Sequence, residues 1–291
     1  MIHSYDFKQQ DHYRASFNRL SQLVFGIEFE AWFQKGCWDD DYICHSIVSD
    51  NEIIANISVS RMNLVVEGVT MNAIQIGTVM THPEHRGKGY SKQLMEYVLK
   101  TYEKTCDVVF LFANSTVLDF YPKFGFKATD ESQFFINVNT TSTKEVTLNR
   151  LNGSREEDWN LIKNIVQSRR PISQRFGVTN NQALFTFYAL SVYPECLYYS
   201  PKDDAIIIYE HDGEVLHLYD VVSTEEIDLE YLIVHIAAKE SRKIKFYFTP
   251  DQLLDQVYMA PFDKKEDVLF VKSNSDLSHI PPFCVPKLAH A

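Results

Sequence analysis

The sequence lacks any apolar run long enough to span a membrane, and it has no segment of low complexity. Its first residues do not show the charged and then apolar pattern of a signal peptide. The cysteines are odd in number and form no Cys-x-x-Cys pair, which fits a reducing cytoplasm with most of them as small core residues. We therefore expect a cytoplasmic protein. The cysteines are Cys37, Cys44, Cys106, Cys196 and Cys284.

Basic residues are fewer than acidic residues. The 28 Lys and Arg residues stand against 39 Asp and Glu residues, which gives a net charge of -11. This balance argues against nucleic acid or an anionic membrane as the partner, and it favours a cationic partner such as an amine. The length of 291 residues suits two domains, and the 20 Phe and 16 Tyr residues can supply two cores.

The most informative segment is residues 77–91, which reads as a strand, a short turn and a glycine-spaced loop that opens an amphipathic helix. Such a loop points several backbone N–H groups into one concavity at the positive end of a helix dipole. Gly87 and Gly89 let the backbone approach a ligand closely, and Arg86 and Lys88 add positive charge. The segment therefore predicts a polyphosphate site.

This loop matches neither a nucleotide P-loop nor a dinucleotide-binding loop. Its spacing, Arg86-x-x-Gly89-x-Ser91, resembles the acyl-CoA pyrophosphate loop of the GNAT acetyltransferases, which is Arg/Gln-x-x-Gly-x-Gly/Ala. Ser91 departs from the pattern at the last position, but it is small and keeps close packing possible. The alternative is a glycine turn that only caps a helix.

A second segment strengthens the resemblance. Val108–Ala113 is a short apolar run that predicts a buried strand, and Asn114 follows it directly. Tyr121 then precedes Gly125 and Phe126. This order is similar to the second GNAT signature, in which two strands splay apart and the pantetheine arm of acetyl-CoA lies in the gap. The resemblance therefore implies acetyl-CoA as the acetyl-donor cosubstrate.

The resemblance also implies roles for individual residues. The main-chain N–H groups of Val79 and Met80 would donate to the pantetheine and the thioester carbonyl. Asn114 would bond to the pantetheine arm or fix the strand end. Tyr121 would protonate the departing thiolate, with an ordinary aromatic core residue as the alternative. The pyrophosphate would be held by Arg86, Gly87, Lys88, Gly89, Tyr90 and Ser91.

The general base is not evident. Many GNAT enzymes carry a glutamate on the strand before the loop, but residues 71–78 contain neither a carboxylate nor a histidine. Deprotonation would then pass through water or through an acid on the acceptor side. Glu28, Glu30 and the run Asp39–Asp41 are the candidates, and with Trp32, Phe33 and Trp38 they could line a pocket for a cationic acceptor. The alternative is that all five carboxylates are solvated surface charges.

We predict an α/β protein with two GNAT-like (acyl-CoA N-acyltransferase) domains, each a mixed, mostly antiparallel sheet flanked by helices. The predicted boundaries are 1–140 for the catalytic domain, 144–275 for a degenerate domain and 276–291 for a proline-rich tail packed on the body. The elements predicted for the first half are helices within 11–35 that meet near Gly26, strands at 42–48, 52–62 and 71–80, and a strand at 134–138 that closes this half.

The second half repeats this order of elements in weaker form. After the strand predicted to end at Val222, the segment 223–228 has no glycine and carries three carboxylates, so we expect this half not to bind CoA. The predicted strands are 144–151, 196–200, 205–210, 214–222 and 244–248, and the predicted helices are 156–167, 181–190 and 228–239.

The resulting hypothesis is an N-acetyltransferase that moves an acetyl group from acetyl-CoA to a primary amine by direct transfer in a ternary complex. Polyamine, aminoglycoside-like, amino-acid and peptide amines all fit the residues as acceptors. A non-catalytic CoA-binding sensor or scaffold is the alternative from another class. The run His82-Pro83-Glu84-His85 is not expected to bind a metal, since no third ligand is evident.

Overall fold

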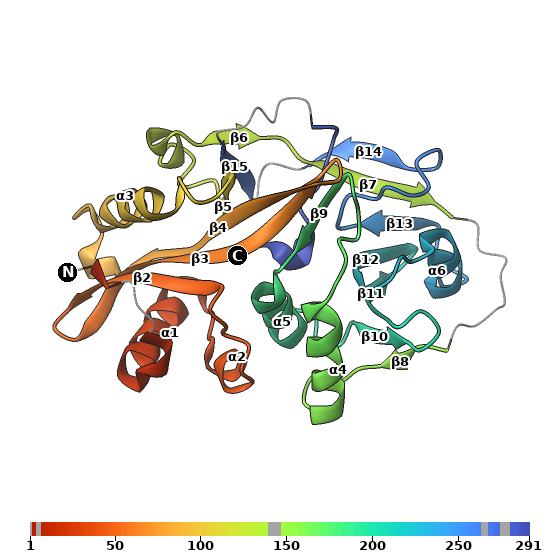
Figure 1. Cartoon of the computed structure of the whole chain (residues 1–291), viewed down its shortest axis with the longest axis horizontal. Helices are drawn as coiled ribbons and strands as arrows, with labels where there is room; N and C mark the ends of the chain where they lie inside the picture. Colours follow the sequence, from red (N-terminus) through yellow and green to blue (C-terminus); the bar gives the residue numbers. More distant parts are fainter. Residues whose placement is uncertain (1, 4–6, 139–146, 263–266, 274–279) are drawn as a thin grey trace.

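The computed structural model describes residues 2–3, 7–138, 147–262, 267–273 and 280–291. Two mixed β-sheets organise these residues, and helices lie beside each sheet (Figure 1). This confirms the predicted fold class and the tandem arrangement. None of the described helices is both long and apolar enough to cross a lipid bilayer.

The first sheet has eight strands in the order β1-β2-β3-β4-β5-β15-β6, and β9 pairs with β3. Its strands are β1 (Ile2–His3), β2 (Tyr42–Ser49), β3 (Glu52–Val66), β4 (Val69–Thr81), β5 (Val108–Ala113), β6 (Lys127–Thr129), β9 (Phe176–Thr179) and β15 (Val268–Ser273). The helices of this half are η1 (Phe7–Gln9), α1 (Asp11–Phe25), α2 (Glu30–Gln34), η2 (Pro83–His85), α3 (Tyr90–Tyr102) and η3 (Tyr121–Phe124).

The second sheet has seven strands in the order β14-β7-β13-β12-β11-β10-β8. Its strands are β7 (Ser132–Asn137), β8 (Asn149–Arg150), β10 (Leu197–Ser200), β11 (Ala205–Asp212), β12 (Val215–Ser223), β13 (Lys243–Phe246) and β14 (Tyr258–Pro261). The remaining helices are α4 (Glu156–Gln167), α5 (Gln182–Ser191), α6 (Leu229–Ile236) and η4 (Lys287–Ala289).

The two sheets share one topology. In each, a helix connects two parallel neighbours, which are β4-α3-β5 in the first sheet and β12-α6-β13 in the second. In each, the strand after the parallel pair comes from the other half of the chain. β15 lies between β5 and β6, whereas β7 lies between β13 and β14. At this position the halves therefore exchange one strand each, and β9 of the second half also joins the first sheet beside β3.

This exchange corrects one prediction. The strand expected at 134–138 does form, as β7, but the prediction that it closes the first half is wrong. Phe134 and Ile136 are buried in the core of the second sheet, and the vacant place beside β5 is taken by β15 with its buried Leu269 and Phe270. Periodicity identifies a strand but not the sheet that it joins.

Most other predicted elements are confirmed within one to a few residues, and α4 has the predicted bounds. α6 is shorter than expected because it ends at Ile236, with Asp228 as its N-cap. The strand predicted at 144–151 lies partly outside the described residues, and its described part is β8. β6, β9, β14 and β15 were not predicted.

The first sheet has two different faces. α3 covers one face with Leu94, Met95 and Val98. The other face packs against α1, α2 and the second half, and the C-terminal segment runs between the two sheets (Figure 1). Phe283, Val285 and Leu288 of this segment are buried, so the predicted packing of the tail on the body is confirmed.

Glu131, in the connection from β6 to β7, anchors this segment. Its Oε1 accepts a hydrogen bond from the Val285 N–H at 2.8 Å, and its main-chain oxygen accepts one from the Phe262 N–H at 3.3 Å. The residue is only 8 % exposed, and this burial raises the pKa of its carboxyl group to about 7.

The pKa of Glu131 predicts a pH dependence of stability. Between pH 4.5 and 7 the folded chain keeps the Glu131 proton that the unfolded chain loses, so the free energy of unfolding should fall as pH rises. The loss assigned to this group is about 3 kcal/mol. Glu131→Gln should remove it, which makes the variant more stable than the parent at pH 8 but not at pH 4.5. Urea unfolding at the two pH values measures this, and Glu226→Gln, at an exposed position, should leave the parent behaviour unchanged.

Candidate active site

β4 and β5 separate at their carboxyl ends. They pair in parallel only from Ala73 and Val108 to Ile76 and Leu111, although β4 continues to Thr81. Their separation leaves the edge of β4 beyond Ile76 without a partner strand, including the main chain of Val79 and Met80. This is the gap that the sequence predicted between the two strands.

A β-bulge in β4 accompanies the separation. The register between β3 and β4 shifts between Asn56 and Ser58, and Thr78 has a positive φ of 45°. A threonine rarely adopts this conformation, so neighbouring groups must hold it there. The Tyr42 hydroxyl lies 2.7 Å from Thr78 Oγ1, and Asn56 Nδ2 donates to the Thr78 carbonyl at 3.2 Å. These bonds fix the bulge at the mouth of the gap.

The loop after β4 presents free N–H groups. Gly87 and Gly89 have φ values of 76° and 83°, and Gly89 is the N-cap of α3. Within the described residues, the backbone N–H groups of residues 87–92 make no hydrogen bond, as expected for the first turn of a helix. The helix dipole adds a partial positive charge at the same place.

Side chains around the loop leave this concavity open. A Cβ atom built on Gly87 or Gly89 would meet no atom within 4 Å. Arg86 and Lys88 are exposed beside it, although Arg86 Nε also donates to the Thr81 carbonyl at 3.3 Å. The residues present therefore fit a diphosphate.

Ser91 has a local function that explains the departure from Gly or Ala. Its hydroxyl lies 2.9 Å from Thr81 Oγ1, which joins the first turn of α3 to the end of β4. The small side chain thus keeps the close packing that the pattern requires, and the hydrogen bond fixes the helix against the strand.

Tyr121 lies in η3, on the side of the first sheet that α3 covers. Its ring packs against Phe120, Phe126 and Phe270, and burial raises the pKa of its hydroxyl to about 12. This hydroxyl makes no hydrogen bond within the described part of the chain. It is therefore a neutral phenol with a proton available to donate.

Asn114 fixes the end of β5. Its Oδ1 accepts hydrogen bonds from the backbone N–H and the hydroxyl of Thr116 at 3.0 and 2.5 Å. Of the two roles that the resemblance implied for Asn114, this geometry agrees with the second.

The predicted acidic residues do not gather into one pocket. Glu30 accepts hydrogen bonds from Arg14 Nε at 2.9 Å and Gln34 Nε2 at 2.6 Å, and the Arg14 bond lowers the pKa of its carboxyl group. Glu28 is exposed. Asp40 pairs with Lys8 at 2.7 Å, and Asp41 accepts from Asn180 at 3.3 Å. Asp39 Oδ1 caps the Asp41 N–H at 2.9 Å, and burial raises the pKa of its carboxyl group.

The two indoles also lie elsewhere than expected. Trp32 and Trp38 are buried in the core between the halves, where they donate to the carbonyls of Ala183 and Tyr42. They therefore do not line an open pocket with the acidic residues.

Sequence reasoning missed a buried polar row on the opposite face of the sheet. Tyr42, Ser60 and Gln75 lie side by side on β2, β3 and β4. Gln75 alternates with Ile74 and Ile76, which face α3, so it points toward the other half. Ser60 Oγ and both amide atoms of Gln75 are buried without a partner in the described residues. The sequence did contain one signal of this row, since Gln75 is a polar residue inside an apolar strand.

The C-terminal segment closes this face below the gap. The His290 ring stacks on Phe112 with 3.8 Å between centroids and 15° between planes, and burial lowers the pKa of its imidazole to about 3. A Cβ atom built on Gly77 would lie 2.6 Å from the Ala291 Cβ, so glycine is required for this close approach.

Comparison with known proteins follows this geometry. The family model described as the acetyltransferase (GNAT) domain matches residues 7–129, which include the gap, the loop and Tyr121. The N-terminal half is thus similar to a GNAT domain. This confirms the resemblance predicted from the sequence, while the search of curated proteins found no match.

Solved structures extend the similarity to both halves. A probable N-acyltransferase of unknown function from Enterococcus faecalis has a TM-score of 0.61 at 14% identity, over 94% of this chain and 72% of that one. Eis1 from Mycobacterium abscessus has a TM-score of 0.59 at 15% identity, over 92% and 72%. A putative acetyltransferase from Pyrococcus horikoshii has a TM-score of 0.50 at 12% identity, over 100% and 95%. At these identities the likeness establishes the fold.

The corresponding helix of the second half has no comparable opening. Asp228 Oδ1 accepts from the Tyr231 N–H at 2.8 Å, and the Leu229 N–H donates to Gln252 Oε1 at 2.9 Å. Two further carboxylates, Glu225 and Glu226, precede α6. Its own side chains occupy the first turn, which agrees with the prediction that this half does not bind CoA.

The loop geometry yields a matched pair of variants. Gly89→Ala and Gly26→Ala each place a Cβ at a positive φ with open space around it, so each should lose roughly 1–2 kcal/mol of stability. Only Gly89→Ala places the methyl group in the proposed path of the diphosphate. We expect its affinity for CoA, measured by calorimetry, to fall at least ten-fold. The Gly26→Ala variant should keep the parent affinity, and equal affinities in both variants would remove the loop from the CoA site.

Proposed function

We propose that the chain is an acetyl-CoA-dependent N-acetyltransferase that acts on a primary amine by direct transfer in a ternary complex. One observation carries the proposal. An open cradle of free N–H groups lies at the start of α3, directly after the strand that separates from its parallel neighbour. The cradle fits the diphosphate, and the gap fits the arm that leads to the thioester.

Each part of the site then has a role. The N–H groups of residues 87–92, with Arg86 and Lys88, bind the diphosphate. The main chain of Val79 and Met80 aligns the pantetheine arm, and Asn114 holds the end of β5 at the opposite side of the gap. When bound, acetyl-CoA supplies the activated acetyl group. The bulge at Thr78 keeps the edge of β4 free for this ligand.

The amine nitrogen attacks the thioester carbonyl carbon, the carbon–sulfur bond breaks, and the sulfur takes the electron pair. Tyr121 donates its proton to the departing sulfur, and the amine releases a proton to water. A covalent acyl-cysteine is disfavoured at three of the cysteines, because burial keeps their thiols protonated. Burial raises the pKa of Cys106 and Cys196 to about 11 and places that of Cys284 well above its usual value.

Tyr121→Phe tests the acid. We expect the turnover number to fall by roughly 10²–10⁴-fold while CoA affinity stays unchanged, because only the proton donor is removed. Since the pKa of Tyr121 is about 12, the parent should lose no activity between pH 7 and 10 through this group, and its rate should rise as the amine deprotonates. Thiol release with a panel of amines measures both effects. Tyr198→Phe in the second half serves as the control.

The same assay separates the enzyme from its alternative, a CoA-binding sensor or scaffold. The absence of a carboxylate from β4 and the close packing of Ala291 on Gly77 favour that alternative. CoA binding without amine-dependent thiol release in the parent protein would establish the sensor. Turnover that Tyr121→Phe leaves intact would instead retain the enzyme and reject Tyr121 as its acid.

Glu28 and Glu30 remain the candidates for a base on the acceptor side. Glu30 is ionised but held by Arg14, which makes it a weak proton acceptor. We therefore expect Glu28→Gln and Glu30→Gln to keep the parent turnover and amine KM. Glu30→Gln should be less stable, because the buried Arg14 then keeps only the exposed Asp11 as a carboxylate partner. A drop in turnover of 100-fold or more in either variant, at roughly the scale of a general base, would identify the base.

A further inference from the structure

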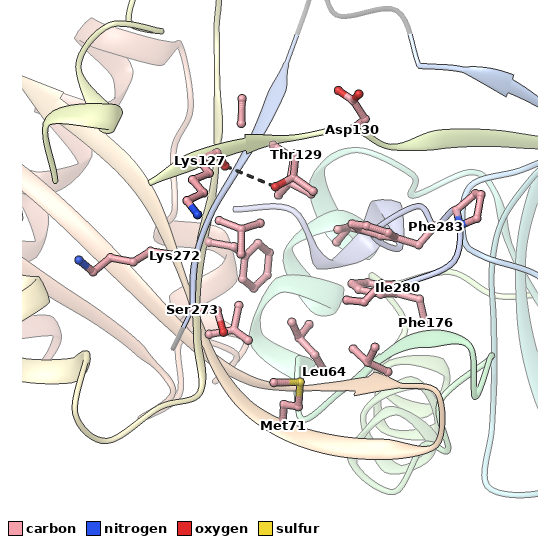
Figure 2. A pocket seen from close by; sticks show the side chains of 18 of the residues that line it. Leu64, Met71, Lys127, Thr129, Asp130, Phe176, Lys272, Ser273, Ile280 and Phe283 are labelled. Carbon is pink, nitrogen blue, oxygen red and sulfur yellow. Dashed lines mark hydrogen bonds between the residues drawn. The ribbon is translucent and has the colours of Figure 1, made fainter. Parts of the chain in front are cut away.

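A cavity of about 850 Å³ lies between the inner face of the first sheet and the C-terminal segment (Figure 2). Its walls come from β3, β4, β5, β6, β9, β15 and residues 280–285. The inner walls are apolar and include Leu64, Phe110, Phe176, Leu269 and Phe283. Its volume is in the range of small-molecule sites, which often lie where two domains meet.

This space is partly open to solvent. It therefore contains water or a ligand, and water against its apolar inner walls has few hydrogen-bonding partners. Replacing that water with an apolar chain is favourable.

The polar groups of the cavity gather at one rim. Figure 2 shows Lys127, Thr129 and Asp130 on one side of the cavity, with Leu64 and Met71 on the other. The exposed Lys127 ammonium has no ion pair or hydrogen bond within the described residues.

Lys272 is the other cation of the rim, and it is already engaged. Its ammonium donates to the Phe124 carbonyl at 3.1 Å and pairs with Glu103 at 3.6 Å, and it points away from the cavity in Figure 2. Of the two cations, Lys127 is therefore the one available to an anion, with the Asp130 carboxylate at the same rim.

We propose that this cavity binds an amphipathic monoanion, an alkyl-chain carboxylate whose chain lies on the apolar walls and whose head pairs with Lys127. It is distinct from the acetyl-CoA site. Met71 lines the cavity near the start of β4, whereas the phosphate loop follows Thr81 at its end, about 30 Å further along the strand. The proposal holds whether or not the chain transfers acetyl groups.

Three probes with one chain and different heads test the ligand class: dodecanoate, dodecanol and dodecylamine, each below its micelle concentration. By calorimetry on the full chain, dodecanoate should bind about two- to five-fold more tightly than dodecanol, with dodecylamine the weakest, since an exposed ion pair contributes modestly. Lys127→Glu should reverse the order of dodecanoate and dodecylamine. Lys123→Glu makes the same charge change outside the cavity and should preserve the parent order.

A second set of measurements tests the location. Thr129→Trp, at a half-buried lining position of the edge strand β6, should weaken all three probes at least ten-fold, whereas Ala31→Trp on α2 should not. In the unmutated protein, dodecanoate should shift the methyl resonance of Met71 but not that of Met95, which packs on the opposite face of the sheet. CoA should not displace the bound dodecanoate.

The proposal is overturned if none of the probes binds, if CoA displaces dodecanoate, or if the Met71 methyl resonance stays unchanged. It is also overturned if Lys127→Glu weakens the three probes equally, because the head group would then make no contact with Lys127.

Discussion

The exchange of β7 and β15 is the constraint on which the rest of the structure depends. Each sheet would be interrupted beside its parallel pair without the strand that the other half provides, because β15 fills the place next to β5 and β7 the place next to β13. The connections that carry these strands, with the C-terminal segment, form the junction between the halves. The gap between β4 and β5 and the cavity both border this shared structure.

At this junction, the C-terminal segment runs along the inner face of the first sheet. Phe283 stacks on Phe176 with 4.4 Å between ring centroids, and Glu131 holds Val285. Further along, His290 lies on Phe112 and Ala291 on Gly77. One continuous segment therefore contacts both the wall of the cavity and the floor of the gap, so each site has the other as a structural neighbour through the same buried residues.

Local features of the sequence predicted the first half well. The glycines at 87 and 89, the apolar run at 108–113 and the tyrosine at 121 are close in sequence, and they define the loop, the strand and the candidate acid by their spacing. Alternation and capping predicted strands and helices, including the bounds of α4. Features that depend on distant pairing were not accessible. β15 and β7 carry no residue pattern that names the sheet they join, and β6 and β9 are too short for a periodic signal.

The same dependence on distant contacts explains why the acidic residues predicted for the acceptor side do not lie together. The carboxylates before β2 were placed together because they are close in sequence, but in the fold Asp40 turns to Lys8 and Glu30 to Arg14. The polar row of Ser60 and Gln75 comes from strands that are adjacent only after folding. Single polar residues in apolar strands are common. A row of them can be recognised only when the pairing register of the strands is known.

The exchange has a consequence for synthesis on the ribosome. The amino-terminal half emerges with one edge of β5 unpaired until residue 273 has been made, more than half a chain later. An unpaired edge of this kind is prone to join a strand of another chain. Rapid docking of α3 and the aromatic residues around Tyr121 against β5 would limit that exposure. Until β15 has been made, this packing is what stabilises β5 in the nascent first half.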